Sequence, residues 1–190
     1  MIDRIASHSN ATIKRIRSLR DKKFRRLEGR FLAEGLRILT EALEAGVVPE
    51  ILVFAEGAHG DPLVESLIGA VETCGGQVIK TSRDILHKIT EKDNPQAVVG
   101  VYRQNPTLLA SVDRSSASIW VVCESLKDPG NLGTILRTCD AVGAGGVILL
   151  DASCDPYSVE SVRASMGALF TQTIVQSDGP GFFRWLRQGP

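Results

Sequence analysis

The stretch DPGNLGTILR at residues 128–137 decides how the second half of the chain folds. The apolar run IWVV at 119–122 precedes it and predicts a buried strand. The residues after it, up to Val142, have helical spacing and end at Gly143. A second apolar run at 147–150 predicts another strand. The order of strand, tight turn, helix and strand predicts a βαβ unit.

The turn residues suggest a ligand site at the start of this helix. Pro129 fixes its own φ, Gly130 can adopt a positive φ, and Asn131 is a good helix N-cap. Gly133 would leave the first amides of the helix uncovered for a ligand. Arg137, one turn further along, would reach back over the same ligand. An ordinary capped connection carrying a surface arginine is the alternative that this spacing leaves open.

The combination of these residues resembles motif 1 of the SpoU (TrmH-type) RNA 2'-O-ribose methyltransferases. The block RASMGALF at 163–170 is similar to the family's motif 2. The strings SNxxIK at 9–14 and FLxEG at 31–35 resemble the family's N-terminal substrate-binding domain. The resemblance implies an α/β fold in which an L30e-like domain precedes a SPOUT domain of the trefoil-knot type.

The same resemblance implies transfer of a methyl group from S-adenosylmethionine (SAM) to a ribose 2'-hydroxyl. Arg137 and Asn131 would be the catalytic residues, with Asn131 orienting the arginine. Arg137 would hold a phosphate or the 2'-oxygen through its planar guanidinium, and the family picture also lets it act as a base. Ser165, Gly167 and Ala168 would line the cofactor, because small residues let backbone groups approach it.

Positive charge is concentrated at the N-terminal end, although the net charge is zero. Residues 1–37 carry eleven Lys and Arg and four acidic residues, so this segment has a net charge of +7 and the remainder −7. Such a concentration favours contacts with RNA phosphates over a merely solvated helix face. The residues predicted to contact RNA are Lys14, Arg15, Arg17, Lys22, Lys23, Arg25, Arg26 and Arg163.

The order of apolar and turn-forming segments predicts two domains. Residues 1–103 would form the L30e-like RNA-binding domain, 104–118 a linker, and 119–190 the methyltransferase domain. Within the first, a helix capped by Ser9 or Asn10 and a basic connector at 22–30 would precede alternating strands and helices. The family's third motif is absent from this sequence, which predicts a methyltransferase domain incomplete at its C-terminus. Its cofactor site and dimer interface would be affected.

Several classes of protein are excluded by composition and spacing. No apolar run is long enough for a membrane span, and no secretory h-region follows Met1. The four cysteines form no CxxC pair, and we expect them to be reduced residues of the core. No metal site is expected. A Rossmann GxGxxG is absent.

We therefore expect a cytoplasmic RNA 2'-O-methyltransferase that is a homodimer if the C-terminal segment is present. The resemblance favours 23S rRNA as substrate. Transfer RNA, or a non-catalytic RNA-binding role, are the alternatives.

Overall fold

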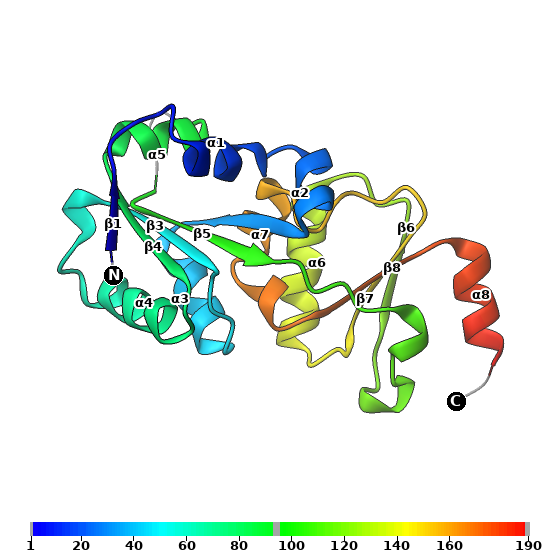
Figure 1. Cartoon of the computed structure of the whole chain (residues 1–190). Coiled ribbons are helices and arrows are strands. Elements are labelled where there is room, and N and C mark those ends of the chain that lie inside the picture. Colours follow the sequence, from blue (N-terminus) through cyan, green and yellow to red (C-terminus); the bar gives the residue numbers. More distant parts are fainter. Residues whose placement is uncertain (1, 93–95, 189–190) are drawn as a thin grey trace. The chain divides into compact units, whose positions relative to one another are not determined.

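The computed structural model describes residues 2–92 and 96–188 (Figure 1). The chain divides into two compact units. The first contains Met1–Gln104 with Tyr157–Val159, and the second contains Asn105–Pro156 and Glu160–Pro190. Within the described ranges, no helix has the length and apolar character needed to cross a membrane.

A five-stranded mixed sheet with strand order β1-β4-β3-β5-β2 forms the centre of the first unit. β1 pairs with β4 and β3 with β4 in parallel, whereas β5 is antiparallel to both β3 and β2. The strands at the N-terminus and at the FLxEG string are absent from the sequence prediction, because neither has a clear apolar alternation. The strands are β1 (Ile2–Ile5), β2 (Arg30–Glu34), β3 (Ile51–Ala55), β4 (Gln77–Thr81) and β5 (Val98–Arg103).

Helices cover both faces of this sheet. Figure 1 shows α1 (Ala11–Ser18) and α5 (Arg83–Thr90) on one face, and α3 (Leu36–Glu44) and α4 (Pro62–Thr73) on the other. The short turn η1 (Glu56–Ala58) precedes α4. Side chains from both helices on the first of these faces, including Ile13, Ile16, Ile85 and Leu86, are buried against the sheet.

Residues 22–30, predicted as a basic connector, contain a helix instead. This is α2 (Lys22–Glu28), which Asp21 begins by accepting a hydrogen bond from the Lys23 amide at 2.7 Å. It ends at Gly29, whose φ of 62° is the left-handed conformation that glycine adopts without strain. The connector prediction was wrong. The segment has no long apolar stripe, but Asp21 and Gly29 cap its two ends and stabilise a short helix.

The FLxEG string has a structural explanation in this unit. Glu34, at the end of β2, is buried and accepts hydrogen bonds from Arg20, at 3.1 Å, and from Lys92. Gly35 follows with a φ of 105° and is the N-cap of α3. The string therefore ends a strand on a paired buried carboxylate and turns the chain directly into a helix.

The second unit is built on a three-stranded parallel sheet with the order β6-β7-β8. α6 (Pro129–Ala141) connects the first pair of strands, and α7 (Val159–Ser165) and η4 (Ala168–Phe170) connect the second. The predicted βαβ unit is confirmed. The strands are β6 (Val121–Glu124), β7 (Gly146–Leu150) and β8 (Thr173–Ser177).

The residues predicted as a linker are packed in the second unit. They include η2 (Leu109–Ser111) and η3 (Arg114–Ser116), and Leu109 and Val112 pack on a cluster formed by β7, β8 and α8 (Gly179–Arg187). The Arg114 guanidinium lies 4.0 Å from the centre of the Trp185 ring and donates a 3.1 Å hydrogen bond to the Leu186 carbonyl. This stretch carries its own tertiary contacts despite having no helical or strand periodicity.

The cysteines are all free, but only one lies in the core as predicted. Cys139 is buried, Cys123 and Cys154 are half-buried, and Cys74 is exposed at the end of α4. Burial raises the pKa of the Cys123 thiol, and burial together with the neighbouring Cys123 raises that of Cys139. Neither thiol is therefore poised as a nucleophile.

Candidate active site and RNA-binding surface

Helix α6 begins three residues earlier than the turn chemistry predicted. Asp128 is the N-cap, and its carboxylate accepts a 2.6 Å hydrogen bond from the Asn131 amide. Pro129 occupies the first helical turn, where its fixed φ and missing N–H are tolerated. The prediction of Asn131 as the cap was wrong, because Asp128 caps equally well and precedes the proline. Gly130 is helical and does not adopt a positive φ.

Gly133 is not an opening above the first helical turn, as the sequence suggested, but a contact between helices. A Cβ atom built there would lie 2.3 Å from the Ala164 Cβ and 2.7 Å from the Ser165 amide nitrogen. Only a glycine allows α6 to approach α7 this closely. The stretches 128–137 and 163–170, separate in sequence, therefore meet at this residue.

The loops that follow β6, β7 and β8 are joined by hydrogen bonds at the carboxyl edge of the parallel sheet. The Cys154 amide donates to the Leu126 carbonyl at 2.6 Å, and the Gly179 amide donates to Asp151 Oδ1 at 3.0 Å. This edge is where open parallel α/β sheets bind their ligands. The N-terminus of α6 lies at the same edge, because that helix follows β6 directly.

Arg137 and Asn131 are both exposed on α6. They are six residues apart, about 9 Å along the helix axis and about 120° around it. Among the described residues, no hydrogen bond joins them and no carboxylate pairs with Arg137. The guanidinium is thus available to a ligand, while an orienting role for Asn131 stays a prediction. Arg163 is also exposed, on α7.

The residues expected to line a cofactor lie at and after the end of α7. Ser165 is buried, and its hydroxyl donates to the Val162 carbonyl at 2.7 Å, so it offers no side-chain group to a ligand. Met166 and Gly167 follow with φ angles of 51° and 103°, and Ala168 begins η4. Apart from the half-buried Met166, this stretch carries only very small side chains, which would let a ligand approach its main-chain groups closely. This fits SAM, whose purine and amino-acid ends can be held by backbone N–H and C=O groups.

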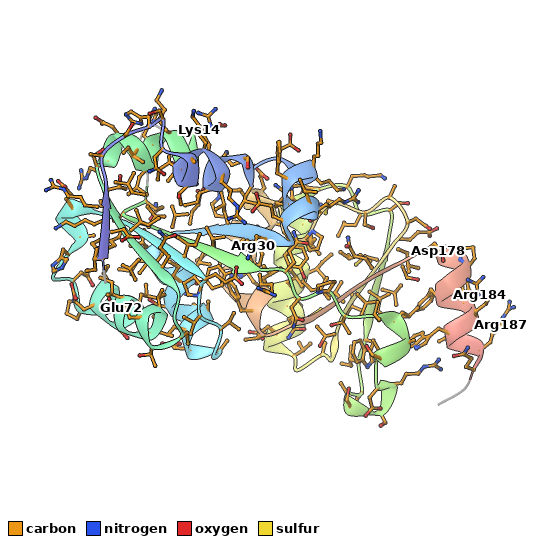
Figure 2. The ribbon with its side chains drawn as sticks, viewed as in Figure 1. Lys14, Arg30, Glu72, Asp178, Arg184 and Arg187 are labelled. Atoms are coloured by element: carbon orange, nitrogen blue, oxygen red, sulfur yellow. The ribbon has the colours of Figure 1, made fainter. Side chains whose placement is uncertain are left out.

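The cations predicted to contact RNA differ in how they are placed in the first unit. Arg25 is buried, and its Nη1 donates to the Leu19 and Arg20 carbonyls at 2.9 and 2.5 Å, so the prediction of an RNA contact there was wrong. Arg15 is exposed but paired with Glu28 at 2.7 Å. Figure 2 shows Lys14 at the outer surface of α1. Those that are exposed and form no ion pair with a described residue are Lys14, Arg17, Lys22, Lys23 and Arg26.

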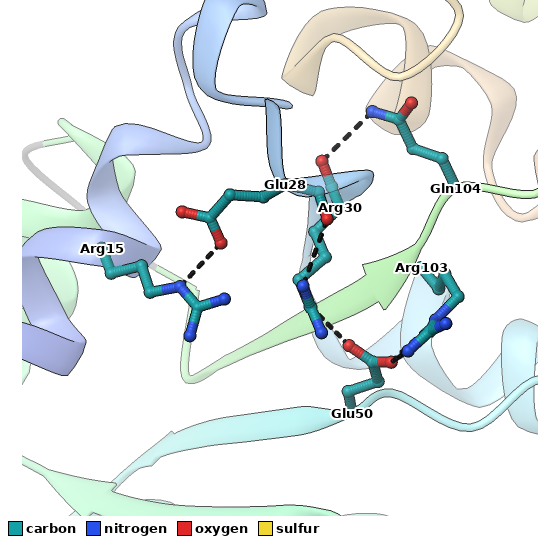
Figure 3. A network of polar contacts seen from close by, with 6 residues as sticks. All are labelled: Arg15, Glu28, Arg30, Glu50, Arg103 and Gln104. Carbon is teal, nitrogen blue, oxygen red and sulfur yellow. Dashed lines mark hydrogen bonds and ion pairs between the residues drawn. The ribbon is translucent and has the colours of Figure 1, made fainter. Parts of the chain in front are cut away.

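Arg30, from the basic N-terminal segment, belongs to a network of ion pairs that sequence reasoning missed (Figure 3). Glu50 accepts from Arg30 Nε at 2.6 Å and from Arg103 Nη2 at 2.7 Å. Burial acts to raise the pKa of Glu50, but the hydrogen bonds and charges of Arg103 and Arg30 outweigh it and lower the pKa overall. In the sequence, the signal for this pairing is only that β2 and β5 each carry an arginine at one end and that a glutamate precedes β3.

The described ranges contain no group of three or more His, Cys, Asp or Glu residues placed to hold a metal ion. The chain instead combines a parallel α/β unit, whose helices meet at Gly133, with an α/β unit that carries the basic N-terminal segment. This is the two-part architecture of the SPOUT-class methyltransferases.

Comparison with known proteins identifies the family. Residues 10–100 match the MRM3-like substrate binding domain, and residues 118–184 match the SpoU rRNA Methylase family. The chain belongs to the SpoU rRNA methylase family.

Solved and curated relatives agree with this assignment. An AdoMet-bound rRNA methyltransferase from Sinorhizobium meliloti superposes with a TM-score of 0.89 at 37% identity, covering 98% of this chain and 69% of that one. The 23S rRNA (guanosine(2553)-2'-O)-methyltransferase RlmP of Bacillus subtilis is 32% identical over 94% of this chain and 66% of its own length.

The human mitochondrial rRNA methyltransferase 3 is 29% identical over 84% of this chain and 38% of its own length. The chain therefore spans between about two fifths and two thirds of these two curated relatives. The trefoil knot implied by the resemblance stays a prediction.

Proposed function

We propose that the protein is a SAM-dependent RNA 2'-O-ribose methyltransferase that acts on 23S rRNA. The observation that carries this proposal is the Gly133 contact, which brings the Arg137 helix and the 163–170 block together. The 2'-O specificity and the 23S substrate are supported by the name of the Bacillus subtilis relative, and SAM by the AdoMet-bound structure.

The residues of this chain would align the reacting groups and stabilise charge. SAM, when bound, supplies a methyl group already activated by its sulfonium charge. The backbone at Gly167 and Ala168 would hold the cofactor, and Arg137 would hold an RNA phosphate or the 2'-oxygen by paired hydrogen bonds. A guanidinium is too basic to give up its proton readily, so we assign Arg137 to charge stabilisation and not to proton abstraction.

We also infer a cytoplasmic homodimer. The location is supported by the bacterial rRNA-modifying relatives, and the dimer by the family resemblance. Light scattering of the purified protein measures the assembly directly, and a monomer at micromolar concentration would overturn the dimer.

Methyl transfer from radiolabelled SAM to ribosomal RNA and to tRNA tests the proposed activity. We expect label at a ribose 2'-oxygen of 23S rRNA. Arg137→Lys should lower the rate on the order of 10²-fold, because lysine lacks the planar pair of donors. Arg184→Lys is the matched control, since Arg184 is exposed on α8 in the same unit (Figure 2).

Label on a base would overturn the proposed reaction, and so would SAM binding by the chain without transfer to either RNA. Label on tRNA alone would overturn the substrate but retain the chemistry. An Arg137→Lys variant as active as the Arg184→Lys control would remove Arg137 from the site.

A further inference from the structure

Helix α2 exposes apolar side chains beside its cations. Leu27 is 76% exposed, the highest value among the large hydrophobic residues described, and Phe24 is 36% exposed. At 100° per residue, Lys22, Arg26 and Lys23 lie within about 100° of one another around the helix. Leu27 and then Phe24 continue the same arc. The outward face of α2 is therefore a row of positive charge bordered by a small apolar surface.

The helix is held firmly from its opposite side. Arg25 is buried and donates to the Leu19 and Arg20 carbonyls, as described above. Gln104 Nε2 donates to the Arg25 carbonyl at 3.2 Å, so the backbone of the helix is also tied to the end of β5. These contacts fix which residues of α2 face outward. The buried side of α2 is thus occupied by Arg25, and Leu27 lies on the exposed side.

The outer face of α2 is also hollowed. Lys22, Lys23, Arg26 and Leu27 line a shallow open depression of about 560 Å³. The Lys23 ammonium lies 5.9 Å from the centre of the Phe24 ring, at the outer limit of a cation–π contact. A ligand for this depression needs negative charge next to a flat apolar group.

We propose that the outer face of α2 binds an unpaired stretch of RNA, an inference that rests on the RNA-directed function proposed above. Phosphates would contact Lys22, Lys23 and Arg26. One unstacked base would lie against Leu27 and Phe24. Unpaired bases can stack on an aromatic side chain such as Phe24 and pack against a neighbouring aliphatic one, whereas the bases of a duplex are already stacked on one another. The exposed apolar pair therefore favours an unpaired loop over a double-stranded stem.

An anionic membrane surface also combines negative charge with apolar contact, but α2 is a poor fit to it. A helix that lies in a membrane interface needs a wide apolar face along its length. α2 has seven residues, of which two are apolar. The membrane is therefore an outcome for the test to exclude.

Fluorescence anisotropy with the full chain tests this proposal on two labelled RNAs, a hairpin with an unpaired loop and a blunt duplex of equal length. Leu27→Asn should weaken hairpin binding about three- to tenfold and leave duplex binding and the salt slope unchanged. Leu63→Asn is the matched control, because Leu63 is 48% exposed on α4. It should bind both RNAs like the parent.

The charged residues are tested separately. Replacing Lys22 and Lys23 with Gln should weaken binding of both RNAs and reduce the slope of log K against log salt by about 1.4 on the hairpin. Arg37→Gln, at an exposed arginine of α3, is the charge control. It should lower the RNA affinity and the salt slope less than the double Lys22 and Lys23 change does.

Equal loss on hairpin and duplex for Leu27→Asn, or no loss on either, would overturn the contact between Leu27 and an unpaired base. If Leu27→Asn instead reduced sedimentation with phosphatidylserine vesicles and left RNA binding intact, the membrane would replace RNA as the ligand. RNA binding that none of the α2 changes alters would overturn this inference and leave the proposed function standing. A parent chain that binds no RNA would overturn both.

Discussion

Gly133→Ala should destabilise the second unit, even though alanine is normally the better residue inside a helix. Replacing a helical glycine by alanine contributes about 1 kcal/mol through backbone entropy. At Gly133, however, the new Cβ would lie 2.3 Å from the Ala164 Cβ and 2.5 Å from its carbonyl carbon. Carbon atoms in contact are normally about 3.5–4.0 Å apart, so α6 and α7 would have to separate by more than about 1 Å.

Overpacking of this kind costs about 1–3 kcal/mol or more, and here the obstacle is partly backbone, which moves less easily than a side chain. After the helical gain is subtracted, we expect the unfolding free energy to fall by about 1–2 kcal/mol. Gly69→Ala is the matched control: Gly69 lies inside α4 with no atom near its would-be Cβ. That variant should be about 1 kcal/mol more stable.

Urea denaturation separates the two variants, because both tryptophans, Trp120 and Trp185, lie in the second unit. The fluorescence transition should shift to lower urea for Gly133→Ala and remain in place for Gly69→Ala. The circular dichroism transition of the first unit should shift to higher urea for Gly69→Ala. A Gly133→Ala variant as stable as the parent would refute the close approach of α6 to α7, and with it the joining of the two blocks.

Three further changes test individual contacts. Asp128→Ala should cost about 1 kcal/mol of stability in urea denaturation, because the first turn of α6 loses its cap, whereas Asp128→Asn should retain most of it. Glu50→Gln should lower stability by about 1 kcal/mol or less at pH 7. Because the folded-state pKa of Glu50 is lowered, the Glu50 ion pairs stabilise the protein fully above the ordinary pKa of Glu and lose this effect as pH falls through the folded-state pKa. The unfolding free energies of the parent and of Glu50→Gln should therefore converge in acid. A constant difference between them down to pH 2 would contradict the pairing with Arg30 and Arg103. Arg114→Ala should lower the thermal midpoint of the tryptophan fluorescence transition by removing a cation from an indole face and from the end of α8, and an unchanged midpoint would argue against both contacts.

The sequence was most informative where local chemistry and burial act together. Asp61-Pro62 predicted the start of α4, because a capping side chain and a proline at the first helical position act locally. The apolar runs predicted β3 and β7, since each of these strands is covered by helices of its own unit. At α6 the same reasoning failed by three residues, because Asp128 and Asn131 could each serve as the cap and only the fold decides between them.

The candidate site was predicted only in part because its geometry depends on contacts between distant segments. Nothing near Gly133 in the sequence indicates that its missing side chain makes room for Ala164. Similarly, Arg25 and Arg26 are adjacent and chemically identical, yet one is bonded to buried carbonyls and the other is exposed. The cluster of charges identified the segment. Which of its cations can reach a ligand depends on which side of the seven-residue helix α2 faces the protein.

The packing of residues 105–118 has a practical consequence for dissecting the protein. A fragment that starts at residue 119, where the apolar pattern begins, would remove Leu109, Val112 and Arg114 from the surface they cover and leave the indole of Trp185 open to solvent. A clone of the second unit should therefore start at Asn105, immediately after Gln104, which forms hydrogen bonds with the first unit. The shorter clone would be prone to aggregation because of this newly exposed apolar surface.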